Sequence, residues 1–259
     1  MRLVERASGM DATDVVSGLD DEATPRTAAF FDDMLERRAA GEPLQYVLGR
    51  WGFRRLDLFV DRRVLIPRPE TEMVVQVALA ELAARGRPTP TVVDLGTGSG
   101  AIALSIALEA PQSRVWATDV SDGAIEVARA NLAGLGTLAA SRVRIARGSW
   151  FGALSPVLKR DVDLVVSNPP YIGDEEDLPA EVEDWEPAAA LRAGATGLEA
   201  IATVIDEAPA WLVEGGVVVI EIGPHQAMAS VRMAVERGFP DVETRLDLTG
   251  RERMLVARW

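Results

Sequence analysis

The chain has 259 residues, 48% of them apolar and 26% charged, an ordinary composition for one large domain or a domain with a smaller cap. The 27 Lys and Arg against 40 Asp and Glu give a formal charge of −13, which argues against a broad phosphate-binding surface. With no cysteine and one histidine, His225, no disulfide, metal centre or Ser-His-Asp triad is expected. We expect no signal peptide or membrane span, and a cytoplasmic location.

The N-terminal quarter is expected to form two small units ahead of the main domain. Residues 1–41 are polar and helix-prone, with an amphipathic helix over Thr27–Ala40 that Gly41 ends. Residues 42–68 are expected to be loop and hairpin, with a short strand at Leu56–Val60. Because the helical unit is too short to hold a core alone, we expect it to pack on the rest of the chain or on a partner.

Residues 69–259 are expected to form the main domain, in which strand and helix patterns alternate. Its first helix begins in the stretch Pro67–Glu72 and ends at Gly86. Strands are predicted at Thr91–Leu95, Val115–Thr118, Val143–Ala146, Val162–Val166, Val217–Ile222, Val242–Leu246 and Met254–Arg258. Further helices are predicted at Ala101–Glu109, Asp122–Leu132, Leu198–Leu212 and Gln226–Arg237. This alternation predicts an α/β fold with a doubly wound, mostly parallel sheet, to which a terminal hairpin adds an antiparallel strand.

The most informative stretch is Ser167–Tyr171, which directly follows the apolar strand pattern Val162–Val166. Its two prolines donate no backbone hydrogen bond and stiffen the segment, so a carbonyl is left free to accept one. Asn168 adds a side-chain acceptor, and Tyr171 adds a flat ring with a polar tip. Two acceptors and a ring suit a planar group that carries an NH2. A strand end followed by a turn explains each residue singly, but the four together favour a binding site.

A second candidate site is the glycine-rich loop Gly96–Gly100, which links the first predicted strand of the main domain to the helix after it. Glycines there permit a tight turn and a close approach of a ligand to the backbone. Asp119 ends the next strand, where a carboxylate can accept hydrogen bonds from both hydroxyls of a ribose. The loop also fits the dinucleotide template Gly-x-Gly-x-x-Ala, so a nicotinamide cofactor and S-adenosylmethionine both remain possible ligands for these residues.

The position of the fourth predicted strand distinguishes between the two candidate cofactors. In a doubly wound sheet the chain starts centrally, winds outward and returns beside the first strand, which makes Gly96–Gly100 and Asn168–Tyr171 neighbours. A donor atom held by the loop would then face an NH2 group held by the second segment. Hydride transfer has no use for this arrangement, whereas methyl transfer to nitrogen does. The residues therefore favour S-adenosylmethionine.

Several motifs of the chain resemble those of the release-factor glutamine N5-methyltransferases (the PrmC/HemK family). They are Asp94–Gly100, Ser167–Ile172 and Leu65–Glu72, with shorter matches at Gly41–Tyr46, Glu186–Leu191 and Glu221–Gly223. The glycine loop is shared by all class I methyltransferases, and the Asn-Pro-Pro-Tyr run by amino-methylating enzymes, including DNA adenine enzymes. The Pro-Arg-Pro-Glu-Thr-Glu stretch is more specific to the family.

The resemblance implies a class I methyltransferase fold and a defined reaction. A methyl group would pass from S-adenosylmethionine to the side-chain amide of the glutamine in the Gly-Gly-Gln motif of peptide release factors. The residues implied to bind the cofactor are Gly96, Thr97, Gly98, Ser99, Gly100, Asp119, Trp150 and Asn168. Those implied to bind the substrate are Asn168, Pro169, Pro170 and Tyr171.

Two features of the chain depart from the family pattern. Ser149 stands where the family often has an acidic residue, next to Trp150, which is expected near the adenine. The helical part before Gly41 is shorter than the helical domain that is thought to help dock the release factor. Reduced docking or a trimmed start would each account for that second difference.

The mechanistic hypothesis rests on positioning. Asn168 and the carbonyl of Pro169 would accept the two N–H bonds of the substrate amide and turn its nitrogen toward the methyl group, while Tyr171 packs against the amide plane. No histidine base is required, since the proton can leave after transfer.

Several alternative functions use some of the same residues. A glutamine methyltransferase of a ribosomal protein and an adenine-N6 nucleic-acid methyltransferase both share the main motifs, although the charge of −13 argues against the second. An NAD-dependent dehydrogenase or an adenosine-ligand sensor needs only the glycine loop and Asp119, and leaves Asn168–Tyr171 unexplained. We expect a monomer that acts on a protein and does not bind nucleic acid directly.

Overall fold

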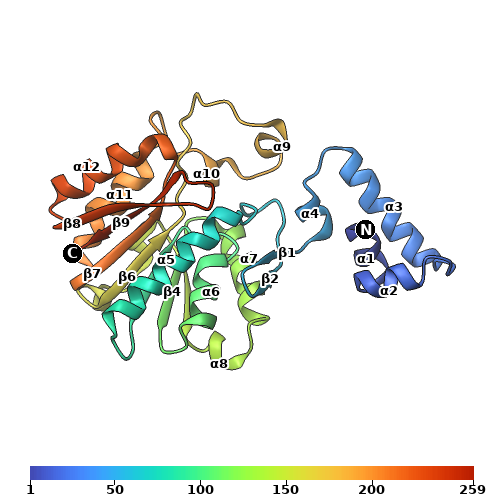
Figure 1. Ribbon diagram of the computed structural model, residues 1–259, viewed down its shortest axis with the longest axis horizontal. Coiled ribbons are helices and arrows are strands. Elements are labelled where there is room, and N and C mark those ends of the chain that lie inside the picture. Colours follow the sequence, from blue (N-terminus) through green and yellow to red (C-terminus); the bar gives the residue numbers. More distant parts are fainter.

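The computed structural model describes all 259 residues and has a seven-stranded sheet as its centre (Figure 1). The strands are β3 (Thr91–Leu95), β4 (Arg114–Asp119), β5 (Val143–Arg147), β6 (Val162–Ser167), β7 (Leu212–Glu221), β8 (Asp241–Leu246) and β9 (Glu252–Arg258). Their order is β5-β4-β3-β6-β7-β9-β8, and β9 alone runs opposite to the other six strands. The doubly wound, mostly parallel sheet expected from the sequence is confirmed, as is the terminal hairpin.

Helices cover both faces of this sheet. The longer ones are α5 (Pro69–Arg85), α6 (Ala101–Glu109), α7 (Asp122–Ala133), α11 (Glu199–Glu207) and α12 (Ala227–Arg237), and short turns of helix are α8 (Thr137–Ala140), α9 (Ala180–Glu183) and α10 (Ala188–Leu191). Consecutive strand residues enter different cores: Val92 packs with α5, α6 and α7, whereas Val93 packs with α11 and α12. None of the helices combines the length and the hydropathy that a membrane crossing needs.

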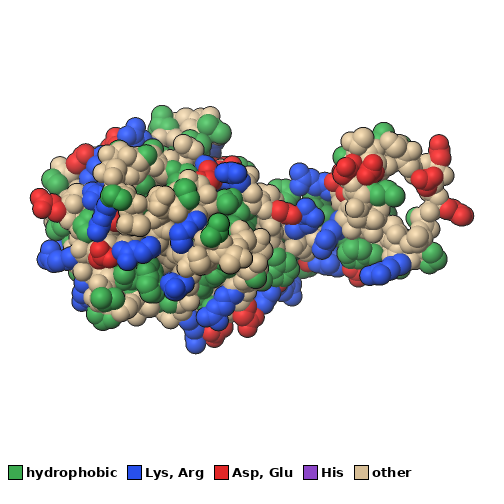
Figure 2. All heavy atoms as spheres, turned by 90° about the horizontal axis from the view of Figure 1, so that it is seen from below, with side chains coloured by type: hydrophobic (Ala, Val, Ile, Leu, Met, Phe, Trp, Pro, Cys, Tyr) green, Lys and Arg blue, Asp and Glu red, His purple; other side chains and the backbone are tan.

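The first 58 residues form a helical lobe and a hairpin. The helices are α1 (Arg2–Ser8), α2 (Ala12–Ser17), α3 (Pro25–Ala39) and α4 (Leu44–Leu48), and the hairpin strands are β1 (Trp51–Phe53) and β2 (Leu56–Leu58). Figure 2 shows the lobe standing apart from the main body, to which a narrower region joins it. Val15 and Met34 are the only buried residues of α1, α2 and α3, so these three helices bury few side chains.

Three predictions about local structure are wrong. The helix expected over Leu198–Leu212 ends at Glu207, because Pro209 lacks the N–H that a continuing helix needs, and β7 already begins at Leu212. Leu212 pairs with Val162 at the start of β6, which makes β7 five residues longer at its start than the periodicity indicates. The stretch after Pro43, expected to be a loop, forms α4, whose Tyr46 hydroxyl donates a hydrogen bond to the carbonyl of Val64.

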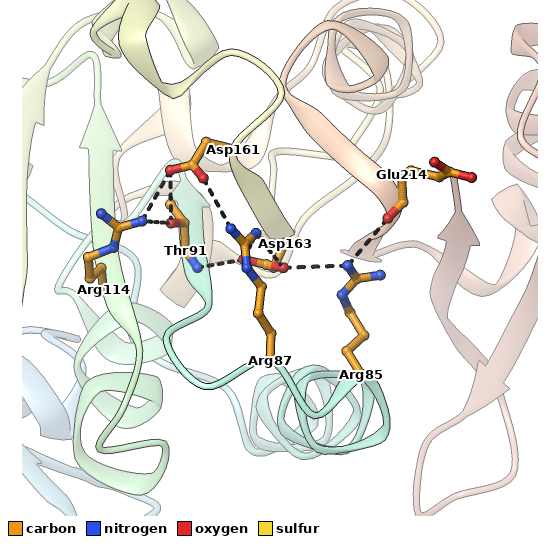
Figure 3. A network of polar contacts seen from close by, with 7 residues as sticks. All are labelled: Arg85, Arg87, Thr91, Arg114, Asp161, Asp163 and Glu214. Carbon is orange, nitrogen blue, oxygen red and sulfur yellow. Dashed lines mark hydrogen bonds and ion pairs between the residues drawn. The ribbon is translucent and has the colours of Figure 1, made fainter.

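A polar network joins the amino ends of the central strands (Figure 3). Asp163 on β6 is fully buried, and its carboxylate accepts hydrogen bonds from the Thr91 backbone N–H at 2.8 Å and from Arg87 at 3.0 and 3.1 Å. Arg85, at the end of α5, lies 3.5 Å away. The network closes the sheet at the end opposite the glycine loop, so it stabilises the fold without touching the candidate site.

We expect Asp163→Ala to lower the free energy of unfolding by about 3–5 kcal/mol, because it leaves the buried Thr91 N–H without an acceptor and removes the buried carboxylate that Arg85 and Arg87 share. Asp161→Ala is the matched control: this carboxylate is partly exposed and meets Arg87 and Arg114, so its loss should cost about 1 kcal/mol or less. Urea unfolding of both variants measures the difference. Equal losses would contradict this account of Asp163.

Candidate active site

A pocket of about 210 Å³ opens at the carboxyl ends of β3, β4, β5 and β6. Loops after all four strands line it, with residues Gly96, Thr97, Gly98, Ser99, Asp119, Val120, Ser121, Gly148, Ser149, Trp150, Asn168 and Pro170. The two stretches that the sequence singled out therefore meet, because β3 and β6 pair in parallel and Leu95 lies opposite Ser167. This is the edge of a doubly wound sheet where ligands bind at the reversal of strand order.

The glycine loop turns sharply between β3 and α6. Gly98 has φ of +54°, and its N–H donates a hydrogen bond of 2.9 Å to Oδ2 of Asp119. At Gly96, where φ is +71°, an added Cβ would lie 3.9 Å from the ring of Trp150. The left-handed backbone at both positions favours glycine, and the missing side chains leave the loop surface open toward the pocket.

Asp119 holds the loop and faces the pocket at the same time. Its Oδ1 accepts a hydrogen bond from the Ser121 N–H at 2.9 Å, and Oδ2 accepts the one from Gly98. Each carboxylate oxygen can accept more than one hydrogen bond, so a polyhydroxylated ligand can still be bound there. Ser121, and not Asp119, caps α7 through a bond to the Ala124 N–H.

Trp150 forms one wall of the pocket, beside the exposed Ser149. Its backbone φ of +45° is unusual for a bulky residue. Trp150 both packs against the core under α11 and α12 and lines the pocket. A half-buried aromatic wall of this kind suits a flat heterocycle.

Asn168 contributes to the pocket from the end of β6. Its side chain is half-buried, and Nδ2 donates a 3.2 Å hydrogen bond to Oγ1 of Thr71, in the first turn of α5. Pro170 also lines the pocket, whereas Gly100, Pro169 and Tyr171 do not. No hydrogen bond within the protein occupies the carbonyl oxygen of Pro169, so it remains an available acceptor.

Tyr171 is held behind this segment. Gln226, which is buried, donates hydrogen bonds from Nε2 to the carbonyl oxygens of Tyr171 at 2.8 Å and Gly197 at 3.0 Å. Burial and the nearby Glu221 raise the pKa of the Tyr171 hydroxyl to about 12, so it stays protonated at neutral pH. The tyrosine is therefore not a base, and His225, which is exposed and outside the pocket lining, is not placed to be one.

The sequence missed the segment that covers the pocket. Arg63, Val64, Leu65, Pro67 and Thr71 all line it. Glu186 fixes this segment, because its buried carboxylate accepts the Ile66 N–H at 3.0 Å and a bond from Arg68. Ala189 and Ala190 of α10, which follow Glu186 in the chain, also line the pocket. The stretches Leu65–Glu72 and Glu186–Leu191 were noticeable as motifs, but their meeting is a tertiary contact.

Asp94 lies under the glycine loop and is fully buried. Its Oδ2 accepts hydrogen bonds from the Thr97 hydroxyl at 2.6 Å and the Ala103 N–H at 3.1 Å, while Oδ1 has no partner. Burial raises the pKa of this carboxyl from 3.8 to about 7, against the lowering effect of those two hydrogen bonds.

This raised pKa predicts a measurable pH dependence of stability. Between about pH 4 and pH 7 the folded state holds a proton on Asp94 that the unfolded chain has lost, so stability falls as the pH rises, by up to about 1.4 kcal/mol per pH unit. Asp94→Asn removes this loss, and its stability relative to the parent protein should rise between pH 5 and pH 7 and then level off. Urea unfolding at four pH values tests this, with the exposed Asp32→Asn as control. A constant difference over that range would rule out the raised pKa.

Comparison with known proteins agrees with the fold and shows the family of the chain. Residues 72–183 match the methyltransferase small domain, and residues 1–49 match the PrmC N-terminal domain. A release factor glutamine methyltransferase of Neisseria gonorrhoeae is 43% identical over 88% of this chain and 81% of its own length. Another, of Cereibacter sphaeroides, is 40% identical over 99% of this chain and 89% of its own length. A solved methyltransferase from Pyrococcus furiosus shares the fold, with a TM-score of 0.57 and 17% identity over 88% of this chain and 98% of its own. The family resemblance of the motifs is thus confirmed, and the chain belongs to the release factor glutamine methyltransferases.

Proposed function

We propose that this protein transfers a methyl group from S-adenosylmethionine to the side-chain amide nitrogen of the Gly-Gly-Gln glutamine in peptide release factors. The observation that carries the proposal is the position of Asn168, an amide acceptor that faces the same pocket as the glycine loop and Asp119. The names of relatives about 40% identical over most of the chain support the same substrate. We place this activity in the cytoplasm, where release factors act, and expect the protein to work as a monomer.

The pocket fits S-adenosylmethionine in its chemistry. The carboxylate of Asp119 suits the ribose hydroxyls, the wall of Trp150 suits the adenine, and the open backbone of Gly96–Ser99 suits the methionine part. When bound, S-adenosylmethionine supplies an electrophilic methyl group on a positively charged sulfur. Arg63 is the single cationic side chain that lines the pocket, and Asp61 and Glu126 already pair with it. A dinucleotide pyrophosphate would therefore find little compensating charge there.

Asn168 and the Pro169 carbonyl would hold the substrate amide. A glutamine amide nitrogen is a weak nucleophile because its lone pair is delocalised into its own carbonyl. By accepting the two N–H bonds, Asn168 Oδ1 and Pro169 O would fix the nitrogen in one orientation, and such positioning can lower a barrier by up to about 7–11 kcal/mol. Tyr171 would support the segment that carries both acceptors, and the proton would leave to water after transfer.

Asn168→Ala should reduce the rate of methylation about 100-fold or more, because it removes one of the two acceptors that orient the amide, while S-adenosylmethionine still binds. The test mixes the purified protein with S-adenosylmethionine and a purified release factor, and maps the modified residue by mass spectrometry. The exposed His225→Ala serves as control and should keep the parent rate.

Each outcome of this assay has a distinct meaning. A gain of one methyl group on the Gly-Gly-Gln glutamine, lost in Asn168→Ala, supports the reaction and the acceptor role together. A parent protein that binds the cofactor but leaves the release factor unmodified would redirect the substrate search to ribosomal proteins or nucleic acid. Retention of the parent rate by Asn168→Ala would contradict the mechanism.

Asp119→Ala should weaken S-adenosylmethionine binding at least about 10-fold, because a charge-assisted hydrogen bond to the ribose is lost. Titration calorimetry of the variant and the parent, with NAD as a second ligand, measures this. Asp122→Ala is the control, since this neighbouring carboxylate pairs with Arg147 and lies outside the pocket. Equal affinity of parent and Asp119→Ala, or preference for NAD, would overturn the assignment.

A further inference from the structure

Behind Asn168, a short chain of hydrogen bonds leads into the protein interior. Nδ2 of Asn168 donates to Oγ1 of Thr71 at 3.2 Å, and the Thr71 hydroxyl donates to Oε2 of Glu221 at 2.7 Å. The three residues come from the end of β6, the first turn of α5 and the last position of β7. Thr71 is 3% exposed and Glu221 is 1% exposed, so water does not compete for these bonds.

The ionised carboxylate fixes the direction of this chain. A carboxylate only accepts hydrogen bonds, so the one proton of the Thr71 hydroxyl must point to Glu221. The hydroxyl then has only lone pairs left for Asn168, which must offer its NH2 group and not its oxygen. Oδ1 of Asn168 consequently faces away from Thr71, and it has no partner within the protein although the residue lines the pocket.

We propose that Thr71 and Glu221 are positioning residues that set the side-chain amide of Asn168 with its oxygen toward the pocket. The inference rests on the proposed function, in which that oxygen accepts an N–H of the substrate amide. An asparagine amide is nearly symmetric in shape, so packing alone does not choose between its two orientations. In the flipped orientation the NH2 group of Asn168 would face the N–H of the substrate amide, and the hydrogen bond to the substrate would be lost. The Thr71–Glu221 pair excludes this orientation, because the Thr71 oxygen requires a hydrogen-bond donor from Asn168.

The charge of Glu221 is what keeps the chain in this direction. A protonated Glu221 can donate to Thr71, the hydroxyl can then donate to Oδ1 of Asn168, and the amide is free to turn. Glu221 has ionisable neighbours on several elements: Glu70 of α5 favours the proton, whereas Arg253 of β9 and Tyr171 oppose it. Burial outweighs these effects and raises the pKa of the Glu221 carboxyl to about 7. The rate should therefore be highest above pH 7 and fall as the pH drops through that value.

The first test compares steady-state methylation by Thr71 variants. Thr71→Val keeps the shape but removes donor and acceptor, so we expect kcat to fall about 10-fold while the dissociation constant of S-adenosylmethionine changes little. Thr71→Ser keeps the hydroxyl and should recover most of that loss. Thr91→Val is the matched control: it removes another buried threonine hydroxyl, bonded to Arg114 at the far end of the sheet, and should leave kcat unchanged. Parent-like kcat in Thr71→Val, or equal losses in the Val and Ser variants, would overturn the proposal.

The second test requires no substrate and so separates this inference from the proposed function. The side-chain ¹H–¹⁵N signal of Asn168, assigned by its absence in Asn168→Ala, should shift in Thr71→Val. In the parent protein it should move in one titration step near pH 7, and in Glu221→Gln that step should vanish together with the acid limb of the rate profile. An Asn168 signal that is unchanged by both substitutions would refute the positioning role of Thr71 and Glu221, even in a fully active enzyme. If the expected shifts occur in a protein that does not methylate release factors, the positioning role of Thr71 and Glu221 is supported and the proposed substrate is rejected.

Discussion

The parallel pairing of β3 with β6 is the constraint on which the rest of the site depends. Leu95 and Ser167 are the last paired residues, and the buried Ser167 hydroxyl donates a 2.7 Å hydrogen bond to the Leu95 carbonyl. Directly beyond this pair the two chains diverge into the glycine loop and into Asn168. Because the register of a parallel ladder fixes where both strands end, a slip of one residue would reverse the faces of β6 and turn Asn168 away from the loop.

Four buried carboxyl groups lie around these two strands, and they differ in their hydrogen-bond partners. Asp163 and Glu186 each accept hydrogen bonds from an arginine and from a backbone N–H, which compensates a buried negative charge. Asp94 and Glu221 accept none from an arginine, and burial raises the pKa of both to about 7. Asp94 lies under the glycine loop and Glu221 lies behind Asn168, so the ionisation of either carboxyl can influence the site.

The segment that covers the pocket is held by contacts between the start of α5 and a distant loop. Arg68 precedes α5, and its side chain reaches Glu186, which follows Asn168 by eighteen positions in the sequence. Trp185, next to Glu186, lies under the guanidinium of Arg62 at 5.3 Å and beside Gly41. The segment before the main domain is thereby attached to the loop that carries the candidate substrate residues.

The sequence by itself determined the fold class and indicated the part of the pocket that the glycine loop, Asp119, Trp150 and Asn168 form. Alternating apolar strands and helices, the loop Gly96–Gly100 and the acid Asp119 are local signals, because turn geometry and strand ends are set by neighbouring residues. Only the tertiary structure decided that Thr71, Leu65 and Glu186 belong to the site and that Glu221 lies behind Asn168. The hydrogen bonds that bring these segments together join residues 97 to 150 positions apart in the sequence. The length of β7 was likewise decided by its pairing with β6 and not by periodicity. A local pattern specifies which face a residue takes on its own element, whereas the ionisation of a buried carboxyl depends on every group that the fold brings against it.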